Sequence, residues 1–333
     1  LQDNTTGGNN IAIGQDTLRE VTTASNNTAV GHAALLSNTS GTNNVALGAN
    51  AGDAITTGSY NTALGKGSLS TSITASNNTA VGESALNQST ADNNTAVGYH
   101  SLIANTTGHS NVAVGHNALD ANTTGQYNTA SGQNALTANT TGNNNTANGH
   151  NALGANTSGI GNAAVGMYSL DANTTANYNT AIGYESLSAN TTGVGNAVVG
   201  AFALKLNTTA NNNTAVGYEC LDANTTVADN TAIGRSSLGA NTTGNYNVAV
   251  GSGALDDNTE ARDNVAVGYN ALGANTTGPC NVAVGQSSLE LNTTGASNTG
   301  IGRASLANNS TASNNTGVGY HSLLANTTGA FNT

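Results

Sequence analysis

Apolar and polar residues alternate in a short pattern that recurs along the whole chain. A segment of the form Asn-Thr/Val-Ala-Val/Ile-Gly begins at Asn10 and returns every 17 residues up to Asn332, apart from one interval of 16 residues. This gives nineteen complete repeats, numbered here as coils 1 to 19, with positions 1 to 17 counted from the leading Asn. The pattern predicts a single repeat domain over residues 1–333, with coils that start at residue 10 and one short coil at residues 78–93.

Several positions of the repeat hold one kind of residue almost throughout. Position 5 is Gly in all nineteen coils, and position 9 is Leu except at Gly52. Position 4 is Val, Ile or Leu except at Ser131 and Asn148, and position 8 is always small. From coil 6 onward position 12 is Asn, usually within Ala-Asn-Thr-Thr-Gly. The consensus is N-[TV]-A-[VI]-G-x-x-[AS]-L-x-A-N-T-T-G-x-x.

A 17-residue unit is too short for a helical hairpin repeat, which needs about 33 residues or more. It is typical of one coil of an all-β parallel β-solenoid, or β-roll, and predicts about 19 coils. Strand alternation then predicts that positions 2, 4, 9, 11 and 13 point inward, whereas positions 3, 8, 10, 12 and 14 point outward. Stacking would align Asn at position 1 in a side-chain amide ladder. Ser131 and Asn148 would be buried, and we expect them to bond each other, the backbone or a trapped water.

Composition and charge exclude several classes of function. One Pro, no Trp, two Phe and 7% charged residues leave few groups for catalysis. With a formal net charge of −11 and only six Lys and Arg residues, the chain has no basic patch for nucleic acid or for an anionic membrane. No apolar run is long enough to insert into a bilayer. Residues 1–10 lack signal-peptide features, so any targeting segment is expected to be removed or to lie outside this segment.

The sub-motif Asn43-Asn44-Val45-Ala46-Leu47-Gly48 resembles the N-S-V-A-I-G signature of trimeric autotransporter adhesin heads, the YadA-like left-handed β-roll. The segment 247–251, Asn-Val-Ala-Val-Gly, keeps the core of that signature. The likeness covers every repeat through five or six positions, although the coil here is longer than the family's. Phage-type tail fibres have similar repeats. The resemblance implies an extracellular or cell-surface homotrimeric rod that binds a host surface protein or glycan.

Position 3 is Ala nearly throughout, which is unexpected for a position that alternation turns toward solvent. Close approach of another backbone would explain the small side chain, so we expect lateral self-association through this face, most simply as a homotrimer. Outward Tyr side chains could join the contact, stack on sugars, or merely occupy tolerant corners. Because the chain ends inside a repeat, head-to-tail continuation into a filament or a longer parent chain is also expected. The candidate contact residues are Ala113, Ala181, Ala249, Tyr99, Tyr184 and Tyr218.

Sequons of the form Asn-x-Ser/Thr recur at position 12. In a glycosylating pathway an outward Asn column would carry glycans, whereas the alternative is an Asn-Thr turn ladder that happens to spell the sequon. The candidate glycosylation sites are Asn105, Asn122, Asn139, Asn173, Asn190, Asn224, Asn241, Asn275 and Asn326.

No cofactor or metal site is expected, because the six His residues are scattered over the coils and the Asp residues at position 10 stand at least two coils apart. Cys220 and Cys280 are three coils apart, too far to pair. The sequence therefore predicts a non-catalytic extracellular structural or adhesive fibre that mediates surface attachment or filament formation. The alternative is an ice- or crystal-surface-binding solenoid that uses outward Thr ladders. A glycan-cleaving solenoid would need clustered carboxylates, which the sequence does not offer.

Overall fold

The computed structural model describes all residues 1–333 and is all-β, without a helix. Nineteen strands of three residues each occupy positions 2 to 4 of the nineteen coils. They are β1 (Ile11–Ile13), β2 (Thr28–Val30), β3 (Val45–Leu47), β4 (Thr62–Leu64), β5 (Thr79–Val81), β6 (Thr95–Val97), β7 (Val112–Val114), β8 (Thr129–Ser131), β9 (Thr146–Asn148), β10 (Ala163–Val165), β11 (Thr180–Ile182), β12 (Ala197–Val199), β13 (Thr214–Val216), β14 (Thr231–Ile233), β15 (Val248–Val250), β16 (Val265–Val267), β17 (Val282–Val284), β18 (Thr299–Ile301) and β19 (Thr316–Val318).

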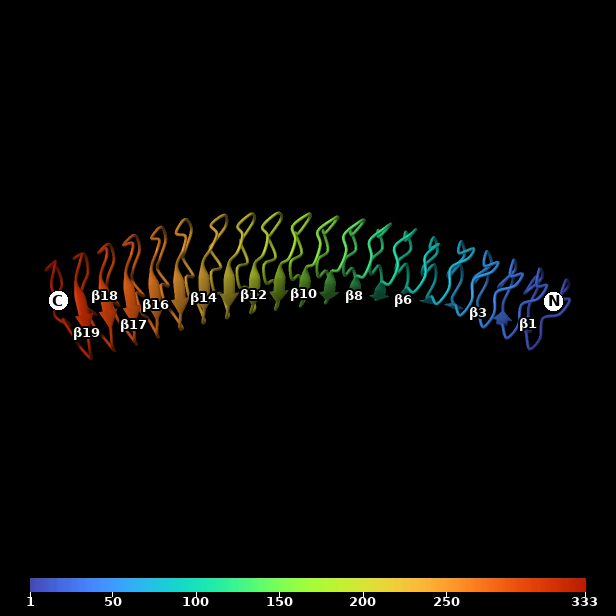
Figure 1. The fold of residues 1–333 in the computed structure, drawn as a ribbon, viewed down its shortest axis with the longest axis horizontal. Coiled ribbons are helices and arrows are strands. Elements are labelled where there is room, and N and C mark those ends of the chain that lie inside the picture. Colours follow the sequence, from blue (N-terminus) through green and yellow to red (C-terminus); the bar gives the residue numbers. More distant parts are fainter. The chain divides into compact units, whose positions relative to one another are not determined.

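The chain forms two compact units, Leu1–Ala164 and Val165–Thr333. Each is a parallel β-solenoid in which every coil contributes one strand beside the strand of the next coil (Figure 1). The first unit contains β1 to β9, the second contains β11 to β19, and β10 spans the division. The predicted fold class, an all-β parallel solenoid with a repeat of about 17 residues, is confirmed.

Strands of neighbouring coils pair in parallel with equivalent positions side by side. Thr129 pairs with Thr146, and Ala130 pairs with Ala147. The short coil keeps the same alignment, since Thr79 of β5 pairs with Thr95 of β6 across 16 residues instead of 17. The missing residue is therefore absorbed in a turn, and the strand column continues unchanged.

The invariant glycine at position 5 ends each strand in a conformation that other residues avoid. Gly115 has φ of 141°, and a Cβ added there would collide with the backbone carbonyl of Gly132 in the next coil. Only glycine satisfies both the positive φ and the close approach of neighbouring coils. This is the physical reason that position 5 never varies.

The interior contains different positions from those that alternation predicts. Positions 1, 3, 8, 9, 12 and 15 are buried, whereas positions 2 and 4 face outward in most coils. Leu at position 9 is fully buried, as expected, in every coil that has it except the last, but Ala at position 3 is also buried and Val or Ile at position 4 is not. Within each three-residue strand, inward and outward side chains do alternate, but position 3 points inward instead of positions 2 and 4. The alternation does not continue through the turns that follow.

The cross-section of the coil is narrow at position 3, where every coil has Ala or Gly except for the buried Val198. In coil 18, where Gly300 replaces Ala, an added Cβ would lie 3.3 Å from Cγ of Leu289 at position 9 of the preceding coil. The Ser288 hydroxyl at position 8 donates to the Gly300 carbonyl at 2.9 Å. Positions 3, 8 and 9 therefore meet across the interior, where Leu fills the space that two small residues leave.

Two columns of buried asparagine line the same interior. At position 1, the Asn128 backbone N–H donates to Oδ1 of Asn111 in the preceding coil at 2.9 Å, and its Nδ2 donates to the Gly142 carbonyl at 2.8 Å. At position 12, Nδ2 of Asn122 donates to Oδ1 of Asn105 at 2.8 Å and to the Gly125 carbonyl at 3.1 Å. The predicted ladder at position 1 is confirmed, and a second ladder stands where outward side chains were expected.

The exceptional coil 3 shows how the interior stays filled. Gly52 replaces Leu at position 9, and Ile55 replaces the usual Asn at position 12. Ile55 is fully buried, and its Cδ1 would lie 3.0 Å from a Cβ at Gly52. The large apolar group thus enters from the other side of the coil, and the volume of the core is kept.

Because position 3 points inward and position 4 points outward, the same substitution should have a large effect on stability at position 3 and a small one at position 4. We expect Ala113→Gln to destabilise the solenoid by several kcal/mol, because a long polar group would enter a site that is filled by an Ala of zero exposure. Val114→Gln, at a side chain that is 40% exposed, should change the free energy of unfolding by less than about 0.5 kcal/mol per chain. Thermal unfolding followed by circular dichroism, in dilute protein, measures both. Equal losses in the two variants would contradict this description of the interior.

Candidate functional surfaces

The outward side chains of positions 2 and 4 form a surface that we call the strand face. At position 4, Val114 is 40%, Ile182 is 40% and Ile301 is 41% exposed. Seventeen of the nineteen residues at position 4 are Val, Ile or Leu, and position 2 holds only Thr, Val, Ile or Ala. No charged residue occurs at either position in any coil. The strand face is therefore an uncharged column of side chains, apolar or Thr at all but two sites, that are half-buried or exposed in every coil.

The Ala column expected to join chains lies on the opposite side of the strand. Ala113, Ala181 and Ala249 have zero exposure and face the interior, so the expected contact through them is wrong. Their small size is required by the packing against positions 8 and 9. The strand side chains that face away from the interior are those of positions 2 and 4.

Ser131 and Asn148 were expected inside, and the structure places both on the strand face. Ser131 is half-buried and Asn148 is exposed. Water can satisfy their polar groups in a single chain, so the expected buried pair is wrong. They are the only polar residues other than Thr on this surface.

Tyrosine side chains border the strand in sequence, two residues before it at position 17 and two residues after it at position 6. Tyr99, Tyr184 and Tyr218 at position 6 are between 37% and 47% exposed. Tyr127 and Tyr178 at position 17 are 56% and 67% exposed. Both positions stand at turns, and position 17 has positive φ, as at Tyr127 with 57°.

Two of the three expected contact tyrosines belong to one aromatic row. Phe202 lies between them, with ring centroids 5.2 Å from Tyr184 and 5.9 Å from Tyr218, edge to face in both cases. Lys205 Nζ lies 5.0 Å from the Phe202 ring centroid and 2.6 Å from Oε2 of Glu185. Hydrogen bonds from Lys205, which has the larger effect, and from Tyr184 hold the pKa of Glu185 below its ordinary value.

The sequence reasoning missed Phe202 and Lys205, although the concentration of aromatic and charged residues in coils 11 to 13 was a visible signal. Tyr99 lies in a separate stack with His100 and His116, at centroid distances of 3.8 and 5.3 Å. The structure therefore does not bring all three tyrosines together.

A Thr edge, which we define as positions 13 and 14, forms a second regular surface. The Thr123 hydroxyl at position 13 donates to the Thr140 carbonyl at 3.1 Å, and the Thr140 hydroxyl donates to the Thr157 carbonyl at 3.0 Å. At position 14, Thr124 and Thr141 are exposed. The outer column is Thr or Ser except at Glu260 and in the short coil, which lacks the position. An array of fixed and exposed hydroxyl groups results.

The sequons at position 12 are inside the coil, so the outward glycan column is wrong. Asn105, Asn122 and Asn275 have zero exposure, and their amides form the second ladder. The same holds for burial at Asn139, Asn173, Asn190, Asn224 and Asn241. Only Asn326, in the last coil, is half-buried. A glycan on Nδ2 would replace a ladder hydrogen bond and would have no space. The Asn-x-Ser/Thr sequence therefore recurs because the turn and the ladder require it.

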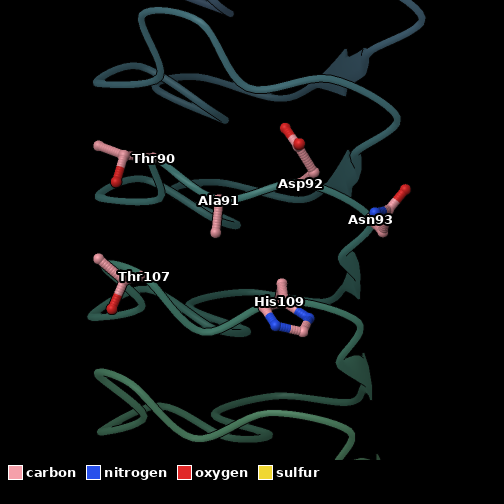
Figure 2. Close-up of a pocket in the computed structure, with 6 residues that line it drawn as sticks. All are labelled: Thr90, Ala91, Asp92, Asn93, Thr107 and His109. Carbon is pink, nitrogen blue, oxygen red and sulfur yellow. The ribbon is translucent and has the colours of Figure 1, made fainter.

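The short coil opens a cavity of about 470 Å³ next to the Thr edge. It is lined by Thr90, Ala91, Asp92, Asn93, Thr107 and His109. In Figure 2 the carboxylate of Asp92 points away from His109, toward the preceding coil, where Oδ1 accepts a hydrogen bond from the Ser76 N–H at 2.7 Å. His109 contacts the Ser110 hydroxyl at 3.2 Å. The two ionisable groups therefore do not form an acid–base pair. The cavity, which we call the notch, mainly interrupts the Thr edge.

The remaining candidate groups stay apart. Cys220 is buried at position 8, where burial raises the pKa of its thiol to about 12, and Cys280 is exposed; both are free, as expected. No three or more His, Cys, Asp or Glu side chains lie close enough together to hold a metal ion. The structure also has no helix of the length and apolarity needed to cross a bilayer.

Compared with protein-family models and with curated proteins, the chain matches none.

Aspartates at position 10 make folding sensitive to pH. Burial raises the pKa of the Asp53, Asp120, Asp222 and Asp256 carboxyls above the ordinary value. Oδ1 of Asp53 and Oδ1 of Asp120 have no hydrogen-bond partner. The folded chain therefore binds protons more tightly at these groups than the unfolded chain does.

Stability should fall as pH rises through the interval between the unfolded carboxyl pKa, about 3.9, and the raised folded values. We expect the melting temperature to increase when the pH is lowered from about 7 to about 4.5. A variant with all four Asp residues replaced by Asn should lose most of this increase. Glu185, whose lowered pKa acts in the opposite direction, is retained in both chains. Thermal melts across this pH range test the assignment, and identical pH profiles for the two chains would refute it.

Proposed function

We propose that the chain is an extracellular, non-catalytic structural or adhesive fibre protein that associates with copies of itself through the strand face. The observation that carries this proposal is the absence of any charged side chain from positions 2 and 4 in nineteen coils, in a chain of net charge −11. The extracellular location, and a trimer as the number of associated chains, are proposed on the resemblance to adhesin heads.

A second copy of the chain suits the strand face better than an unrelated partner. An uncharged surface can meet itself without bringing like charges together, and its coil-to-coil period is matched by an identical period on the partner. If each coil buried about 60 Å² on each partner, about ten coils would reach the roughly 1,200 Å² at which stable interfaces begin. Exposed Tyr before and after the strand fits such a contact, because aromatic residues are enriched at protein–protein interfaces relative to the rest of the surface.

Stacked coils also suit a structural role. Each coil bonds only to its neighbours, so stability grows with coil number and no single site holds the unit together. The Asp92 and His109 side chains in the cavity at the short coil point apart and do not form a catalytic pair. Attachment would then use residues that vary between coils, above all the aromatic row of coils 11 to 13.

A charge placed on the strand face should separate the chains without unfolding them. We expect the wild-type chain to sediment as an oligomer and the double variant Ile182→Lys/Ile233→Lys as a monomer, because both side chains are about 40% exposed and outside the core. The matched control is Thr192→Lys/Thr243→Lys, on the Thr edge of the same two coils, which should remain oligomeric. A wild-type chain that is monomeric at every concentration would refute the proposed contact.

The Thr edge favours a second candidate function, binding to ice or another crystalline surface. Its inner hydroxyls are fixed by coil-to-coil hydrogen bonds, as between Thr191 and the Thr208 carbonyl at 3.0 Å, and its outer Thr column is exposed. A regular hydroxyl array can match an equally regular lattice, although Glu260 and the notch at the short coil interrupt it.

This second function predicts a measurable thermal hysteresis of freezing for the wild-type chain. Thr141→Tyr should abolish most of the effect, because a bulky ring would stand above the array. Gln133→Tyr, at position 6 of the same coil, where Tyr occurs naturally, should leave it intact. Absence of hysteresis and of inhibited recrystallisation in the wild-type chain would exclude ice as the surface.

A further inference from the structure

A strand face built from near-identical coils does not by itself fix how two chains align along their length. A shift of one chain by a whole coil replaces one Val or Ile contact with another, so many registers would have almost the same free energy. Association through this face, on which the following inference rests, therefore needs an additional feature to specify one register.

The strand face has one such feature, the polar pair formed by Ser131 and Asn148. These residues end the consecutive strands β8 and β9 and are direct neighbours in the parallel ladder. The preceding strand ends in Val114, which pairs with Ser131. From β1 to β7, position 4 is apolar in every coil. Within the first unit, the polar pair is thus the only departure from apolar residues at position 4.

We propose that Ser131 and Asn148 fix the axial register of parallel chains that associate through the strand face. In register, the hydroxyl and amide of one chain meet those of its neighbour and can exchange hydrogen bonds. After a shift of one coil, Ser131 of one chain faces Val114 of the other and loses both water and a polar partner. Unpaired buried polar groups disfavour that alignment. A lone polar residue in the apolar seam of a coiled coil selects its register for the same reason, at some cost in affinity.

Disulfide trapping between chains that each carry one exposed cysteine measures the register directly. The background carries Cys280→Ser, which removes the exposed thiol, while Cys220 is buried and its thiol pKa of about 12 keeps it unreactive. Chains with Thr62→Cys in β4 and chains with Thr79→Cys in β5 are mixed, oxidised and digested for mass spectrometry. We expect same-site crosslinks, 62 to 62 and 79 to 79, to exceed the one-coil crosslink, 62 to 79, by at least about tenfold.

Removing the polar pair should relax the register while the chains stay associated. In Ser131→Val/Asn148→Val chains, we expect the 62-to-79 crosslink to rise to the level of the same-site crosslinks. Sedimentation should show association at least as tight as in the unmodified chain, because the interface gains apolar groups. Retention of same-site crosslinks alone would refute the proposal, as would mixed crosslinks in chains that keep the polar pair.

Moving the pair by one coil gives the sharpest test. The triple variant Val114→Ser/Ser131→Asn/Asn148→Val carries the pair in coils 7 and 8, and all three sites are outward, so circular dichroism should show an intact fold. When this variant carries Thr62→Cys and is mixed with unshifted chains that carry Thr79→Cys, crosslinks between 62 and 79 should become dominant. If the register does not follow the pair, the inference is wrong.

The outcome separates this inference from the proposed function on which it rests. Chains that remain monomeric in sedimentation would remove both, because no interface would exist. Chains that associate, and lose the association with Ile182→Lys/Ile233→Lys, but crosslink without regard to the polar pair, would support the strand-face contact and remove only the role of Ser131 and Asn148.

Discussion

Buried asparagine amides determine the shape of each coil. The position 1 side chain donates to the carbonyl at position 15 of its own coil and accepts from the backbone of the next coil, as Asn128 does with Gly142 and Asn145. The position 12 side chain donates across coils and across its own turn. In a low-dielectric interior these hydrogen bonds are strong when complete, and leaving one partner unpaired costs about 1 to 3 kcal/mol. The coil therefore has a closely defined, narrow cross-section.

A narrow cross-section explains the other constant positions. Only Ala or Gly, with one Val, fits at position 3, only small residues fit at position 8, and one Leu per coil supplies most of the apolar volume. That Leu takes the left-handed region, as Leu119 does with φ of 53°, which costs roughly 1 to 2 kcal/mol. Full burial of its side chain contributes about 1.5 to 3 kcal/mol and offsets the strain. The β-branched residues at positions 2 and 4 lie on the outward side of each strand and create the strand face.

Sequence alone predicted the period, the parallel solenoid, the buried Leu at position 9 and the Asn ladder at position 1, because each follows from repetition and stacking. It did not predict which residues of each strand point inward. A three-residue strand offers only one buried position, and Ala113 and Val114 are equally compatible with either phase until the width of the coil is known. The same limit applies to Asn122, whose sequon suggests a surface site whereas its ladder hydrogen bonds place it inside. Phe202 and Lys205 depend on contacts between coils that no single repeat contains.

Regular coils constrain what the molecule can recognise. A surface that repeats at every coil can match only a partner with the same period, such as a second copy or a lattice, so unique recognition must come from coils that depart from the pattern. The departures found here leave the interior intact. Ile55 replaces the volume lost at Gly52, and the deletion in the short coil leaves the pairing of Thr79 with Thr95 unchanged. Ser131, Asn148, Tyr184 and Phe202 stand at outward positions or turns. The interior therefore limits variation to sites that cost little stability, and these are the sites where a repetitive chain can carry specific information.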